Sequence, residues 1–85
     1  MILNSQYCFS RNNGQQYLVN IDNGDVYQIN DVTFDILSLC NQFNDIKSLA
    51  HEIYYRYQDA NENYSINDLV EFINILVCNK IIIND

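Results

Sequence analysis

Proline and tryptophan are absent from this sequence, and its 85 residues include only two glycines. A proline can stop a helix because it lacks a backbone N–H, so helix ends in this chain must depend on capping side chains instead. Long apolar runs are also missing, and the N-terminus, MILNSQYCFSRNNG, has neither a basic start nor a long apolar centre. We therefore expect no membrane span, no signal peptide and a cytoplasmic location.

Basic residues are scarce. Four Lys and Arg stand against eleven Asp and Glu, which gives a net charge of −7, and no segment gathers the basic residues into a patch. Because phosphate contacts dominate affinity for DNA and RNA, such a surface would repel nucleic acid. The charge indicates either a partner with some basic character or a role in solubility alone.

Residues that carry chemistry are few and scattered. Cys8, Cys40 and Cys78 are widely separated, which argues against a thiolate metal site or a disulfide framework and predicts three buried apolar side chains. The only histidine, His51, has Glu52 as its nearest acidic neighbour and no Ser or Cys at a spacing typical of a nucleophile. We expect no catalytic residue, no metal site and no cofactor.

Two Asn-Gly pairs, Asn13-Gly14 and Asn23-Gly24, divide the first third of the chain. Asn-Gly supplies the positive φ angles of a type I′ turn, so each pair predicts a tight hairpin. Three strands are expected, at about residues 6–11, 16–22 and 25–29. In such a meander the second strand is central and the third is an edge.

Apolar residues recur every three to four positions from Val32 onward, which predicts helices. Asp31 is expected to cap the first helix, Asp45 the second, and Ser65 or Asn67 the third. The three helices are predicted at about residues 32–42, 46–58 and 66–79. The stretch QDANENYS is expected to be a polar loop between the second and third helices.

The last helix is expected to end with Asn79 or Lys80 in a left-handed conformation. After it, KIIIND is predicted to be an extended tail packed over the first helix. Three strands followed by three helices indicate a single α+β domain over residues 1–85, with the helices on one sheet face.

The predicted third helix carries more apolar surface than a small core needs. Leu69, Phe72, Ile73 and Leu76 form one stripe at helical spacing, and Ile66, Val70 and Val77 widen it along one flank. Each such side chain left in water forgoes about 1.5–3 kcal/mol of burial. Either the domain or a partner must therefore cover this flank.

The stretches GDVYQINDVTFDILSLCN and DLVEFINILVCNKIII together resemble the PqqD-like family, also called the precursor peptide recognition element of ribosomally made, modified peptides (RiPPs). Ile29-Asn30 stands for the family's Leu-Asn and Ile36-Leu37 for its Ile-Leu, while Asp68-Leu69, Phe72-Ile73 and Leu76 match the last helix. The resemblance covers about residues 17–83. Two departures are Thr33 or Phe34 in place of a small residue, and Lys80 in place of the usual Gly.

The resemblance implies a winged-helix-like fold without catalysis of its own. Such proteins bind the leader of a ribosomally synthesised precursor peptide and deliver it to a modifying enzyme, such as a radical crosslinking enzyme or a lasso-peptide peptidase or cyclase. In the family the leader adds as a strand beside the third strand and lies against the third helix. An unpaired edge strand beside apolar surface predicts the same β-augmentation from the residues alone.

The residues expected to bind the peptide lie on the third strand and the third helix. For each apolar one the alternative is ordinary core packing, above all for Ile29 and Ile73. Asp68 and Glu71 are candidate contacts for a basic leader residue. The apolar and amide candidates are Val26, Tyr27, Gln28, Ile29, Ile66, Val70, Ile73, Asn74 and Val77.

Two other functions compete with this hypothesis. A DNA-binding winged helix has a similar element order, but residues 66–79 contain no Lys or Arg and carry Asp68 and Glu71 instead. A structural subunit or a weak homodimer is the second alternative, because three consecutive isoleucines, Ile81 to Ile83, are adhesive near a chain end.

Overall fold

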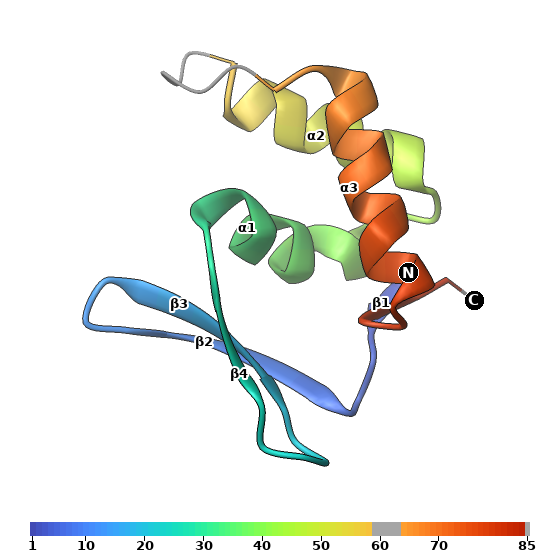
Figure 1. Ribbon diagram of the computed structural model, residues 1–85. Coiled ribbons are helices and arrows are strands. Elements are labelled where there is room, and N and C mark those ends of the chain that lie inside the picture. Colours follow the sequence, from blue (N-terminus) through green and yellow to red (C-terminus); the bar gives the residue numbers. More distant parts are fainter. Residues whose placement is uncertain (59–63, 85) are drawn as a thin grey trace.

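The computed structural model describes residues 1–58 and 64–84 and shows an antiparallel three-stranded sheet followed by three helices (Figure 1). The predicted α+β class is therefore confirmed. The sheet lies on one side of the molecule and the helices on the other. Most of the predicted QDANENYS loop falls outside the described residues.

The sheet has the order β2-β3-β4, with β2 at Tyr7–Asn12, β3 at Gln15–Asn20 and β4 at Val26–Ile29. Leu18 of central β3 pairs with Phe9 of β2 on one side and with Tyr27 of β4 on the other. Its side chain is almost fully buried. The third strand is an edge, as the sequence predicts.

The two Asn-Gly pairs form different turns. Asn13 and Gly14 both have positive φ, 54° and 79°, as a type I′ turn requires. In the second pair only Gly24 has positive φ, and residues 21–25 form a wider loop, so the predicted tight turn at Asn23-Gly24 is wrong. Side chains explain the difference, because Asn20 and Asn23 accept backbone N–H groups of Asp22 and Asp25.

The helical part contains α1 (Asp31–Leu39), a single 3₁₀ turn η1 (Cys40–Gln42), α2 (Ile46–Arg56) and α3 (Ile66–Cys78). Asp45 caps α2 as predicted, and Ser65 caps α3 in a capping box with Asp68. Lys80 is left-handed at φ 60°.

The predicted cap of the first helix is wrong by one residue. Asn30, in an extended conformation, is the cap, and its side chain accepts the N–H of Thr33, whereas Asp31 is already helical. Asp31 accepts a hydrogen bond from Gln16 of β3 instead.

Residues near both ends of the chain pair with each other, which the sequence did not indicate. β1 (Ile2–Leu3) and β5 (Ile82–Ile83) form an antiparallel two-stranded sheet. The isoleucine tail therefore folds back on β1 rather than over α1. Ile82 is fully buried, whereas Ile83 and its partner Ile2 are exposed.

The core lies between the helices and the inner face of the sheet, and its largest fully buried side chains are apolar: Ile36, Cys40, Leu49, Ile53, Leu69, Ile73 and Ile82. Cys40 is buried as predicted, but Cys8 and Cys78 are exposed. Cys8 lies between the half-buried Tyr7 and Phe9, so strand alternation turns it to the outer sheet face. No helix within residues 1–58 and 64–84 is long and apolar enough to cross a membrane.

Candidate functional site

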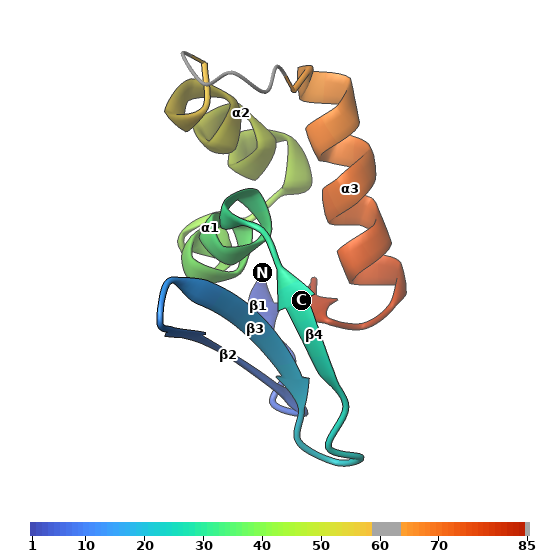
Figure 2. The same ribbon diagram turned by 60° about the vertical axis from the view of Figure 1, so that its left-hand side comes forward.

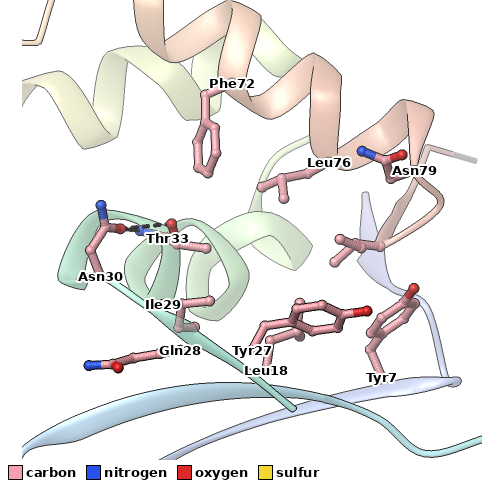
Figure 3. A pocket seen from close by; sticks show the side chains of 11 residues that line it. Tyr7, Leu18, Tyr27, Gln28, Ile29, Asn30, Thr33, Phe72, Leu76 and Asn79 are labelled. Atoms are coloured by element: carbon pink, nitrogen blue, oxygen red, sulfur yellow. Dashed lines mark hydrogen bonds between the residues drawn. The ribbon is translucent and has the colours of Figure 1, made fainter. Parts of the chain in front are cut away.

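A groove lies between edge strand β4 and helix α3, and Figure 2 shows both elements facing this space. The cavity in it measures about 690 Å³. In Figure 3, Phe72 and Leu76 project from α3 toward Ile29 and Tyr27. The lining comprises Tyr7, Leu18, Tyr27, Gln28, Ile29, Asn30, Thr33, Phe72, Leu76, Asn79 and Ile81.

The backbone of β4 offers hydrogen-bonding groups to an added strand. Asn20 donates its N–H to the carbonyl of Asp25, and the β3–β4 pairing continues in register from there. Backbone groups alternate in direction along a strand, so those of Tyr27 and Ile29 face β3, and those of Val26 and Gln28 face outward. The free edge therefore presents two N–H and two C=O groups beside the groove.

Side chains of β4 alternate as well. Tyr27 and Ile29 lie on the side that faces the groove, and Ile29 is half-buried against the core. Val26, which is 60% exposed, is on the opposite face of the sheet together with Gln28, whose amide contacts Gln15. All four strand residues predicted to bind the peptide thus lie on β4. Tyr27 and Ile29 turn their side chains to the groove, whereas Val26 and Gln28 turn backbone groups to the free edge.

One flank of α3 forms the opposite wall. Phe72, Leu76 and Asn79 follow one another at spacings of four and three, which places them on a single helix face. α3 runs antiparallel to β4, because Asn79 shares the cavity end with Tyr7 and Tyr27, while Phe72 lies near Asn30. The wall is therefore apolar along most of its length and polar at the Asn79 end.

Asn30 fixes the end of the groove next to α1. Its Oδ1 accepts hydrogen bonds from the N–H of Thr33 at 2.9 Å and from the Thr33 hydroxyl at 2.7 Å. These bonds hold both side chains in place at the point where β4 turns into α1 (Figure 3). The short strand and the helix cap thus form one continuous border of the groove.

A second hollow, of about 340 Å³, continues the groove toward the start of α3. It shares Asn30 and Phe72 with the larger cavity. Its lining consists of Asn30, Val32, Tyr64, Asp68, Leu69 and Phe72. Among the residues that line the two hollows none is basic, and Asp68 is the one that carries a formal charge.

Tyr27 contributes a neutral hydroxyl. Its Oη donates to the carboxylate of Asp25 across 3.4 Å, and the negative charge of that carboxylate raises the pKa of Tyr27. The hydroxyl therefore stays protonated at neutral pH, and the ring remains an apolar surface with a polar tip.

The predicted helix residues are distributed differently. Ile73 is fully buried in the core, and Val70 and Val77 are half-buried and pack against it. Ile66 and Asn74 line neither hollow, and only Asp68 of the two acidic candidates does; Glu71 is exposed elsewhere on α3. A role for the non-lining residues in peptide binding stays a prediction.

Sequence reasoning missed most of the groove walls, namely Tyr7, Leu18, Asn30, Thr33, Phe72, Leu76, Asn79 and Ile81. The apolar stripe predicted for the third helix includes Phe72 and Leu76, but as core residues. A helical wheel identifies which residues are apolar, but it does not tell which flank faces the edge strand.

The groove has the chemistry of a binding surface. No group of three or more His, Cys, Asp or Glu side chains that could hold a metal ion occurs among the described residues. His51 is half-buried on α2 and lines neither hollow. Unpaired backbone groups beside apolar walls are suited to an extended peptide.

Comparison with protein families gives a match over residues 15–82 to the model of coenzyme PQQ synthesis protein D (PqqD). Comparisons with curated proteins and with solved structures gave no match. The matched span contains β3, β4 and all three helices, so it includes both walls of the groove. The chain therefore belongs to the PqqD family.

Proposed function

We propose that this protein binds the leader of a ribosomally synthesised precursor peptide by adding it as a strand to β4. The leader backbone bonds to the outward groups of Val26 and Gln28, and alternate leader side chains enter the groove against Phe72 and Leu76. The protein has no catalytic role and delivers the leader to a peptide-modifying enzyme.

The observation that carries this proposal is that β4 is, among the residues that the structure describes, an edge strand without a partner on its outer side, and that it lies directly beside an open apolar groove. Backbone hydrogen bonds supply affinity that does not depend on sequence, and the groove supplies selection of side chains. Membership of the PqqD family, which acts in RiPP biosynthesis alongside modifying enzymes, supports the same function.

The chemistry of the served enzyme is a finer part of the proposal. A radical enzyme that crosslinks peptides and a lasso-peptide peptidase or cyclase are both compatible with a leader-binding partner. Reconstitution of modification with each enzyme class, with and without this protein, distinguishes them by the product mass.

The test is a calorimetric titration of the protein with the synthetic leader half of a short precursor peptide encoded beside it, and separately with the core half. We expect binding of the leader with a Kd in the micromolar range or tighter, and no binding of the core half. A folded protein that binds neither half, alone or with the enzyme present, would contradict the proposal.

A self-associating subunit is the second candidate, because Ile2 and Ile83 lie opposite each other and are 45% and 37% exposed. Sedimentation equilibrium over a range of protein concentrations tests it. A mass that stays at the monomer value contradicts this candidate.

A further inference from the structure

The register of β4 determines which side chains of an added strand enter the groove. Residues paired with Val26 and Gln28 form the backbone hydrogen bonds, and their side chains lie on the outer sheet face with those of Val26 and Gln28. The residue opposite Tyr27 points to the inner face. The residue opposite Ile29 points the same way, and the two are separated by one position.

The position opposite Tyr27 faces the larger cavity. Tyr27 and Leu76 border it with ring and hydrocarbon surface, the uncharged side chains of Tyr7 and Asn79 lie at the same end, and the cavity of about 690 Å³ has room for an aromatic or long aliphatic side chain. No formal charge occurs in its lining. A charged side chain here would lose water without meeting an opposite charge, so the site selects a large uncharged residue with mainly apolar surface.

Ile29 lines the larger cavity together with Asn30 and Phe72, the two residues that this cavity shares with the second hollow, so a long side chain opposite Ile29 can extend into that hollow. α3 runs antiparallel to β4, so moving from Tyr27 to Ile29 along the strand corresponds to moving from Leu76 toward Asp68 along the helix. Leu69 and Phe72 give this hollow apolar walls, and the exposed Asp68 places a carboxylate in its lining. A Lys or Arg matches it, because its aliphatic stem packs on apolar surface while its head meets the acid.

We propose that the protein selects leaders in which a large apolar residue and a basic residue are two positions apart. This inference rests on the proposed strand addition at β4 and specifies the peptide for it. The order of the two residues reports the direction of the added strand. An antiparallel leader has the basic residue before the apolar one, and a parallel leader has it after.

The test begins with selection from a display library of random 12-residue peptides against the full protein. We expect enriched peptides to carry an aromatic or long aliphatic residue two positions from a Lys or Arg. Selection against Val26→Pro should enrich this family much less strongly, because that variant removes an outward N–H of β4.

Titration of one enriched peptide and its Lys→Gln or Arg→Gln version then measures the charge contact. For the wild-type protein we expect this change in the peptide to raise the Kd about fivefold. For the Asp68→Asn protein we expect the same change in the peptide to leave the Kd almost unaltered. Asn retains an oxygen that can accept in the capping box. Asp22→Asn, which removes a charge from a loop outside both hollows, is the matched control and should leave the fivefold difference intact.

Two failures have different meanings. Enrichment of apolar peptides that depend on Val26 but show no basic preference, or equal basic preference with Asp68→Asn, overturns the paired-residue inference and leaves strand addition standing. Enrichment that is insensitive to Val26→Pro, or no enrichment by a folded protein, contradicts strand addition itself.

Discussion

At the scale of single residues, a hydrogen bond between Tyr57 and Asp35 links the C-cap of α2 to α1. The Tyr57 hydroxyl donates to the Asp35 carboxylate at 2.6 Å, and both side chains are half-buried. Burial is the main cause that raises the pKa of Tyr57, and the hydrogen bond and charge of Asp35 add to it. The phenol is therefore held in its protonated form as the donor.

Tyr57→Phe should lower the free energy of unfolding by about 1 kcal/mol at neutral pH, because it removes this bond and leaves the carboxylate without its donor. Urea unfolding followed by circular dichroism measures the change. Tyr55→Phe, two residues earlier in α2 and 71% exposed, is the control and should change little.

The same pair gives a pH dependence. Above about pH 10 the unfolded chain releases the Tyr57 proton while the folded chain keeps it, so the unfolded state binds fewer protons and stability falls as pH rises. The contribution is fully present below pH 10. Urea midpoints from pH 8 to 11 should decline less steeply for Tyr57→Phe than for the wild type; parallel declines would contradict this assignment.

At the scale of elements, neighbouring residues of β4 direct their backbone N–H and C=O groups to opposite sides. Those of Tyr27 and Ile29 face β3, and those of Val26 and Gln28 face the free edge. Val26→Pro should weaken leader binding by about fivefold or more, because it deletes one outward N–H without touching the ladder to β3. Val26→Ala keeps the N–H on the same exposed position and should bind nearly as well. Fluorescence anisotropy with a labelled leader gives both affinities, and equal weakening by the two variants would point to the side chain.

The two flanks of α3 can be compared directly by truncation. Phe72 lines the groove, whereas Val70 lies on the other flank and packs against the core. Both Phe72→Ala and Val70→Ala should cost stability, but only Phe72→Ala should weaken leader binding, by about tenfold. The reverse pattern would show that the leader lies along the flank that was predicted from the sequence.

Local signals made the elements predictable. Asn13-Gly14, Asp45 and Ser65 act through contacts within a few residues, and the structure confirms the turn and both caps. The wide loop after β3 was not predictable from Asn23-Gly24 alone, because the Asn20 and Asn23 side chains accept backbone N–H groups of the loop and favour it over a type I′ turn. The α3 wall of the groove was not predictable from the sequence, because only tertiary packing decides which flank of α3 faces β4.

At the scale of the whole molecule, the small β1–β5 sheet covers the core beside the C-terminal end of α3 (Figure 1). Ile82 and Met1 both join the buried cluster, and the terminal amino group of Met1 donates to the carbonyl of Phe43 at 2.9 Å. No local pattern predicts this pairing, because its partners are near opposite ends of the sequence. It contributes apolar burial that a small domain needs.

Ile82→Ala should lower the free energy of unfolding by about 2–4 kcal/mol, because it leaves a cavity at a fully buried position. That is a large part of the roughly 4–13 kcal/mol expected for a domain of this size. Ile83→Ala, next in the same strand but exposed, is the matched control and should cost much less. Chemical unfolding measures both, and equal losses would contradict the described packing of β5.

The β1–β5 pairing also has a consequence for the order of folding. The β2–β3 hairpin and the three helices consist of contacts between residues close in sequence, whereas Ile2 meets Ile83 only after nearly the whole chain has been brought together. Closing so long a loop is entropically costly, so contacts of this kind form late. During synthesis on a ribosome, the β2–β3–β4 sheet and the first helix can form before β5 emerges. The core becomes fully buried only when β5 pairs with β1 and Ile82 packs into it.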